Sequence, residues 1–167
     1  SFQRQNLLDP SAPNPSVETL LHAFLPHKFV DHTHSTAVLS LTDQPNGEQL
    51  AREIYGDRVV VIPYVMPGFD LARLCAELFP KHAGANTIGM ILLNHGIFSF
   101  GASARESYER MIALVDRAER HLDNRKAWSL NHATTDTAGV PIADIAALRG
   151  EISRAAGFPM IMATHRD

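Results

Sequence analysis

The fold class is decided by residues 59–100, VVVIPYVMPGFDLARLCAELFPKHAGANTIGMILLNHGIFSF. The stretch opens with a β-branched run, Val59–Ile62, which a proline ends, and this pattern predicts a buried strand. Three leucines and a cysteine then share one face of a predicted helix over residues 69–79. Two apolar runs, 90–94 and 97–100, flank a His-Gly pair and predict paired strands with a tight turn. Strands that alternate with helices indicate an α/β domain.

Further elements are predicted on both sides of this stretch. Ser16 has the chemistry of a helix N-cap, and the first fifteen residues, which hold three prolines, predict an extended arm. Pro141 is placed at a favoured first helical position. We predict a strand over residues 27–34 and helices over residues 17–24, 36–41, 48–55, 102–122 and 141–156. The whole chain, residues 1–167, is expected to form one domain.

The composition excludes several classes of partner. The 167 residues carry a net charge of −3, which does not favour nucleic acid or an anionic membrane. The longest apolar runs fall far short of the ~20 residues that span a bilayer, and no export signal is visible, so we expect a cytoplasmic chain. Cys75 is the only cysteine, which excludes an intrachain disulfide and a cysteine-rich zinc site. Any metal must therefore be held by carboxylates and by some of the nine histidines.

The triplet His32-Thr33-His34 is the first candidate for metal chemistry. On a strand, residues i and i+2 point the same way, so the two imidazoles can reach one ion. Such a pair alone is as often two ordinary polar residues, and zinc needs a third ligand. His95 is the best third candidate, because it interrupts an apolar run beside a glycine that permits close approach. By itself, His95 could equally be a core or turn histidine.

Two further residues could take part in chemistry. Glu18 precedes His22 by one helical turn, and the short segment 25–34 can bring that helix beside the predicted strand. The competing interpretation is an ordinary first-turn glutamate that the helix dipole favours. Tyr64 lies just past a buried strand, where loops commonly carry function, although local sequence alone favours a plain loop tyrosine.

Several motifs occur together in a recognisable order. They are Pro15–Thr19 (PSVET), Val30–Ser35 (VDHTHS), Ile62–Gly68 (IPYVMPG), Asn94-His95-Gly96, Gly101 and Glu106-Ser107-Tyr108. Together they resemble the class II aldolase/adducin family, over most of the chain from Pro15 to about Leu122. The first two motifs most resemble the aldolase part of bifunctional rhamnulose-1-phosphate aldolase/alcohol dehydrogenase proteins. The first four of these motifs, in this order, are far more specific than any one of them.

The resemblance implies a fold and a metal. The fold is a three-layer α/β/α domain with a central mixed sheet, incomplete at its N-terminus. The ion is Zn²⁺, or another divalent metal, and the resemblance assigns it to His32, His34 and His95. Before Pro15, nothing resembles the phosphate-binding Gly and Ser loops of the family, so we interpret the chain as a fragment of a longer protein.

The resemblance also implies site roles and a reaction. Glu18 serves as the acid/base and Tyr64 as a proton donor at the aldehyde oxygen. Many members place two serines before this glutamate; here Val17 takes the second position, which leaves Ser16 to bind the phosphate. The implied reaction is cleavage of a ketose 1-phosphate to dihydroxyacetone phosphate and an aldehyde.

The implied partners are a small phosphorylated sugar, identical subunits in a homo-tetramer and a fused short-chain dehydrogenase domain. Epimerases and dehydratases of the same superfamily share the zinc triad, so both remain alternatives. A different class of function is a non-catalytic adducin-like module, or a scaffold for a dehydrogenase domain. The presence of three histidines together with Glu18 argues against a decayed metal site.

Overall fold

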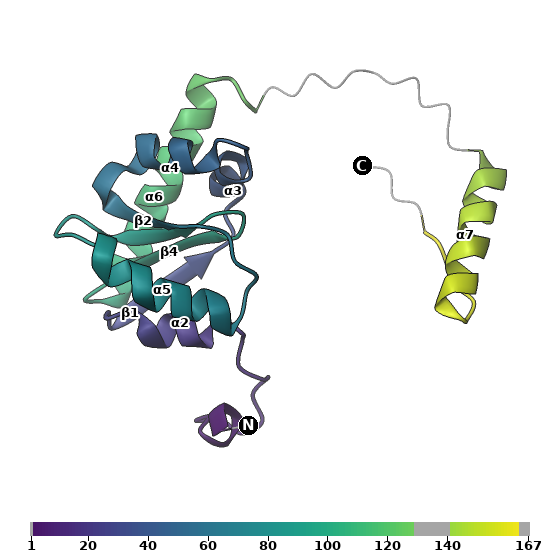
Figure 1. The fold of residues 1–167 in the computed structure, drawn as a ribbon, viewed down its shortest axis with the longest axis horizontal. Helices are drawn as coiled ribbons and strands as arrows, with labels where there is room; N and C mark the ends of the chain where they lie inside the picture. Colours follow the sequence, from purple (N-terminus) through teal and green to yellow (C-terminus); the bar gives the residue numbers. More distant parts are fainter. Residues whose placement is uncertain (1, 129–140, 164–167) are drawn as a thin grey trace. The chain divides into compact units, whose positions relative to one another are not determined.

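The computed structural model describes residues 2–128 and 141–163 and divides into two compact units, residues 1–128 and 129–167 (Figure 1). Each unit is described by itself. The first unit holds helices and strands in alternation. Its helices are α1 (Phe2–Gln5), α2 (Thr19–Phe24), α3 (Thr36–Thr42), α4 (Gly47–Tyr55), α5 (Phe69–His82) and α6 (Ala104–Asn124), with a 3₁₀ turn, η1, at Gly56–Arg58. Its strands are β1 (Phe29–Thr33), β2 (Val59–Ile62), β3 (Gly89–Leu92) and β4 (Gly96–Gly101).

The four strands form one mixed sheet in the order β1-β4-β3-β2. β2 and β3 are parallel, and α5 supplies the crossover that a parallel pair requires. β3 and β4 form the tight antiparallel hairpin that the apolar runs predicted. β1 pairs with β4 in antiparallel register, with His32 opposite Phe98. This register brings His32 beside the segment that follows His95.

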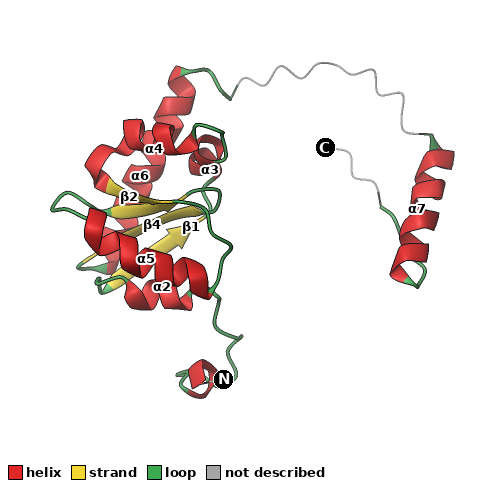
Figure 2. Cartoon of the chain, in the orientation of Figure 1, coloured by secondary structure: helices red, strands yellow, loops and turns green. Residues whose placement is uncertain are grey.

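Helices cover both faces of the sheet (Figure 2). Along β2, Val59 and Val61 face a core shared with α3, α4 and α6, whereas Val60 and Ile62 face α2 and α5. This alternation follows from the two-residue period of a strand, and burying each such side chain contributes roughly 1.5–3 kcal/mol. The expected α/β class with a mixed sheet between helical layers is confirmed.

Several element boundaries differ from the prediction. α2 begins at Thr19, and Glu18, not Ser16, is its N-cap residue; the Ser16 hydroxyl instead accepts from the Glu18 amide at 3.1 Å. α5 continues through Pro80 to His82, although a proline removes one backbone hydrogen bond from the last turn of the helix. Residues 2–5 form a helical turn, not an extended arm, and the Asn6 side-chain amide Nδ2 donates to the Phe2 carbonyl at 2.8 Å.

The second unit contains α7 (Ile142–Ala156), which ends at Gly157 in the left-handed conformation (φ 77°). Pro141 takes the N-cap position, so the helix begins one residue later than predicted. Among the helices of residues 2–128 and 141–163, none is long and apolar enough to cross a membrane. A single domain over residues 1–167 remains a prediction.

Candidate active site

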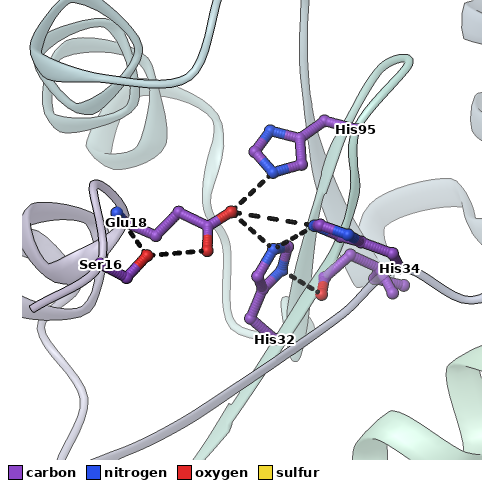
Figure 3. A network of polar contacts seen from close by, with 6 residues as sticks. Ser16, Glu18, His32, His34 and His95 are labelled. Carbon is purple, nitrogen blue, oxygen red and sulfur yellow. Dashed lines mark hydrogen bonds and ion pairs between the residues drawn. The ribbon is translucent and has the colours of Figure 1, made fainter. Parts of the chain in front are cut away.

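Four side chains that the sequence singled out converge at one end of the sheet (Figure 3). Glu18, His32, His34 and His95 each bring one potential ligand atom to a point where all four atoms lie within 4.8 Å of one another. Glu18 Oε1 lies 2.7 Å from His95 Nε2, 3.1 Å from His32 Nε2 and 3.8 Å from His34 Nε2. The two Nε2 atoms of His32 and His34 are 3.0 Å apart.

Each side chain is placed by a different local feature. His32 is on β1, and His34 lies one residue past its end, on the same side as the two-residue period requires. His95 stands in the turn between β3 and β4. Asn94, which precedes it, has φ 55°, a left-handed conformation that asparagine tolerates better than most residues. Glu18 enters from the start of α2.

The ring of His32 has a defined tautomer. Its Nδ1 lies 3.0 Å from the Ile97 carbonyl, which can only accept, so Nδ1–H donates and Nε2 is left unprotonated in the neutral ring. The side chain is 9% exposed. Burial lowers the pKa of His32, and the hydrogen bond to Ile97 together with the nearby Glu18 only partly offsets this. The neutral form, with its Nε2 lone pair facing the cluster, is therefore favoured.

Glu18 is held as a carboxylate. Burial raises its pKa, but the hydrogen bond with His95 and the proximity of His32 and His95 outweigh burial, so the pKa lies below its usual range. The Ser16 hydroxyl donates to Oε2 at 3.3 Å, which leaves Oε1 to face the imidazoles. Glu18 thus points its charge at the three rings.

This donor set fits a cation. His32 Nε2 and the ionised Glu18 Oε1 lie 3.1 Å apart, and two unprotonated acceptors so close repel unless a proton or a metal ion lies between them. His95 is 6% exposed at its side chain, and its Nδ1 has no hydrogen-bond partner among the described residues. His34 is 56% exposed, so the cluster has one side open to solvent. Imidazole nitrogens with a carboxylate oxygen suit zinc and similar divalent metals.

The structure places Ser16 beside Glu18 but does not bring Tyr64 to the cluster within this chain. Tyr64 is 50% exposed, and its hydroxyl contacts Met66 Sδ at 3.9 Å. Sequence reasoning missed the residues of β4 that contact His32. They are Ile97, Phe98 and Gly96; the sequence marked Gly96 only as a point of close approach beside His95, and the pairing of β1 with β4 shows that all three lie next to His32.

Comparisons with known proteins agree with this architecture. Residues 2–122 match the family model described as class II aldolase and adducin N-terminal domain. The chain is 40% identical over 119 residues to the uncharacterized oxidoreductase YuxG of Bacillus subtilis (strain 168), covering 71% of this chain and 17% of that protein. It is 30% identical over 116 residues to the methylthioribulose-1-phosphate dehydratase of Acidiphilium cryptum (strain JF-5), covering 60% of this chain and 54% of the dehydratase.

A solved structure gives the same family. The N-terminal class II aldolase domain of a conserved protein from Thermoplasma acidophilum aligns with a TM-score of 0.61 and 42% identity, over 71% of this chain and 54% of that one. The chain spans about half the length, or less, of these relatives. Because the family model covers most of the chain, including all four clustered side chains, the chain belongs to the class II aldolase and adducin family.

Proposed function

We propose that this chain carries the metal-dependent active site of an aldolase. Its substrate is a ketose 1-phosphate of the rhamnulose-1-phosphate type, and its products are dihydroxyacetone phosphate and an aldehyde. The observation that carries the proposal is the convergence of three imidazole nitrogens and one carboxylate oxygen within 4.8 Å. The family match supports it, because that match spans all four residues.

His32, His34 and His95 are the residues that would hold the ion, with Zn²⁺ the first choice and another divalent metal the alternative. When bound, such an ion polarises the substrate carbonyl and stabilises the negative charge that develops on its oxygen. Ile97 supports this role, because its carbonyl fixes the tautomer in which His32 Nε2 is free to bind.

Glu18 is the group that moves the proton. Cleavage breaks the C3–C4 bond after the C4 hydroxyl loses its proton, and the carbon left at C3 must then be protonated. Glu18 Oε1 faces the histidine cluster and is 20% exposed at its side chain, so substrate bound on the open side lies within its reach. Ser16 holds the other carboxylate oxygen and is also the candidate for contact with the substrate phosphate.

Tyr64 is proposed to handle the aldehyde oxygen. Its hydroxyl is exposed and contacts Met66 in its own chain, so we place this role at the cluster of a neighbouring subunit, in line with the proposed homo-tetramer. A fused dehydrogenase domain in the full-length protein is proposed on the similarity to YuxG, a protein named as an oxidoreductase of which this chain covers only 17%. A cytoplasmic location completes the proposal.

Dehydration is the second candidate reaction, because one relative of 30% identity is named as a methylthioribulose-1-phosphate dehydratase. Both reactions act next to a ketone of a sugar 1-phosphate. In dehydration a base removes the C3 proton and the C4 hydroxyl leaves, so Glu18 would serve as that base. The two reactions therefore use the same residues and differ in which bond at C4 breaks.

The deciding experiment incubates the purified, zinc-loaded protein separately with rhamnulose 1-phosphate, with methylthioribulose 1-phosphate and with a pentulose 5-phosphate. The products are then identified by NMR and mass spectrometry. Formation of dihydroxyacetone phosphate and lactaldehyde supports the aldolase. Loss of one water with an intact carbon chain assigns the dehydratase. Turnover of only a pentulose 5-phosphate assigns an epimerase, and no turnover of any substrate by full-length, metal-loaded protein refutes the catalytic proposal.

A further inference from the structure

Strand β4 encloses the ring of His32 on three sides. The Ile97 carbonyl lies at one edge of the ring, 3.0 Å from Nδ1. The Phe98 ring covers one face, with centroids 4.0 Å apart and planes inclined by 14°. Gly96 lies at the remaining edge, next to Cε1. None of these three β4 residues, Gly96, Ile97 and Phe98, has a side chain that can bind a metal or transfer a proton. Any effect that they have on the site must therefore act through His32.

Gly96 is required for space. A Cβ at this position would lie 2.6 Å from the Thr33 carbonyl oxygen, 2.8 Å from His34 Cδ2 and 3.0 Å from His32 Cε1. Contacts under 3.0 Å force something to move, and these fall on the Thr33 carbonyl and the ring of His34. The 3.0 Å contact with His32 Cε1 is tighter than an ordinary van der Waals contact, so the ring of His32 must give by a few tenths of an ångström. Its backbone is not in the positive-φ region, so conformational freedom is not the reason for glycine.

Phe98 fixes the plane of the imidazole. It is fully buried and stands directly opposite His32 in the β1–β4 register, so the two rings form a cross-strand pair. The His22 ring also contacts Phe98 edge-on, with ring centroids 5.5 Å apart and planes inclined by 60°. Stacking restricts rotation of the His32 ring about its Cβ–Cγ bond, while the Ile97 carbonyl selects which nitrogen carries the proton.

We propose that Gly96 and Phe98 are positioning residues for the metal site, acting together to hold His32 Nε2 toward the cluster. The metal-affinity part of this inference rests on the proposed function. The positioning of the ring does not, because it is a property of the protein without an ion.

The chain offers a matched control for Phe98. Phe100 lies two residues further along β4, is also fully buried, belongs to the same apolar core and stacks on His27 with centroids 4.0 Å apart and planes inclined by 4°. His27 is not part of the cluster. The substitutions Phe98→Leu and Phe100→Leu therefore remove equivalent rings, one from a clustered histidine and one from a histidine outside the cluster.

Zinc affinity is measured by competition with a chromophoric chelator, and the coordination sphere by the visible spectrum of the Co²⁺-loaded protein. We expect Phe98→Leu to lower zinc affinity about 10–100-fold and to change the Co²⁺ spectrum, as loss of an outer-sphere partner does. The two substitutions should lower the melting temperature by similar amounts. Phe100→Leu, however, should leave the zinc affinity and the Co²⁺ spectrum unchanged. Equal affinity losses in the two variants would overturn the proposal.

Gly96→Ala tests the second contact, with Gly101→Ala as its control. A Cβ at Gly101 meets the Ser107 amide nitrogen at 2.7 Å, an overlap of similar size at the other end of β4. We expect only Gly96→Ala to weaken zinc binding. Equal effects of the two substitutions on metal affinity count against the proposal.

A measurement without metal separates this inference from the proposed function. ¹⁵N NMR of the imidazoles in the metal-free wild type should show His32 as a single tautomer with the proton on Nδ1. Phe98→Leu should populate both tautomers, and Phe100→Leu should not. A wild type that shows both tautomers refutes the positioning role even if zinc binds. If the wild type shows one tautomer but binds no zinc, the metal site is refuted, whereas the positioning of the His32 ring by Gly96 and Phe98 still holds.

Discussion

Glu18 is the residue at which the catalytic and the ordinary interpretations differ most. Its Oε1 lies 2.7 Å from His95 and 3.1 Å from His32, contacts that a glutamate serving only the helix dipole does not need. We expect Glu18→Gln, in the full-length protein, to keep the fold while the cleavage rate falls on the order of 10² to 10⁴, the usual contribution of a positioned proton-transfer group. Steady-state kinetics on the substrate identified above is the measurement.

A surface glutamate provides the control for Glu18. Glu48 is in the first turn of α4 and pairs with Arg52, so Glu48→Gln should cost a few tenths of a kcal/mol in stability and leave the rate unchanged. If Glu18→Gln behaves in the same way as Glu48→Gln, Glu18 is merely a helix-start carboxylate.

At the scale of elements, the junction between α2 and β1 is held against β4 through His27. Its ring stacks on Phe100 and meets Phe79 edge-on at 6.1 Å. Burial, together with the positive charge of Arg110, lowers the pKa of His27. The folded state therefore prefers the neutral ring, and the unfolded chain binds a proton more readily. Stability from this contact is fully present above the unfolded pKa of about 6.5 and is lost as the pH falls through the lower folded value.

The substitution His27→Phe tests this contact, because it retains a stacking ring that cannot be protonated. Between pH 8 and pH 5, urea unfolding of the wild type should show a larger loss of free energy than unfolding of the variant. His32, whose pKa is also lowered, leaves a residual pH dependence in both. Parallel stability curves for the two proteins would contradict the role of His27.

At the scale of the whole molecule, the cluster joins segments that are distant in sequence: the start of α2, β1 and the β3–β4 turn. An ion bound there links all three in the folded state only. We expect zinc at 100 times its dissociation constant to raise the free energy of unfolding by about 2.7 kcal/mol, and a chelator to reverse this gain. Calorimetry with and without zinc measures it, and His34→Ala, which removes the most exposed ligand, should abolish the shift.

Quaternary structure is the second prediction at this scale. The proposed role of Tyr64, whose hydroxyl contacts Met66 in its own chain, is at the cluster of a neighbouring subunit, so we expect a homo-tetramer by light scattering at micromolar concentration. A monomer under these conditions would remove Tyr64 from the reaction. Tyr64→Phe would then leave the cleavage rate unchanged.

Much of the fold was predictable because its signals are local. The run Val59–Ile62 and the two apolar runs around His95 have the periodicity and length of buried strands, and the structure confirms them. The start of α2 was not predictable, because Ser16, three residues before the helix begins, makes a turn with the Glu18 amide instead of capping the helix. α5 passes through Pro80, where a local rule predicts an end.

The residues of the candidate site that have reactive or metal-binding side chains were predictable from the sequence. The residues that only pack against them were not. Three histidines and Glu18 were singled out by residue type and motif order, and the structure brings them together. Gly96, Ile97 and Phe98 look like an ordinary strand in the sequence. Their contact with His32 depends on the pairing of β1 with β4, two segments 65 residues apart, and no local pattern encodes that register.

The unequal exposure of the clustered side chains has a kinetic consequence. His34 is 56% exposed, whereas His32 and His95 are 9% and 6% exposed, so solvent molecules approach the cluster past His34. An ion bound there can be reached by a competing ligand before it has left the protein. Metal exchange should then be associative, with a rate that rises in proportion to chelator concentration. A cluster closed on all sides would instead release its ion at a fixed rate, whatever the amount of chelator outside.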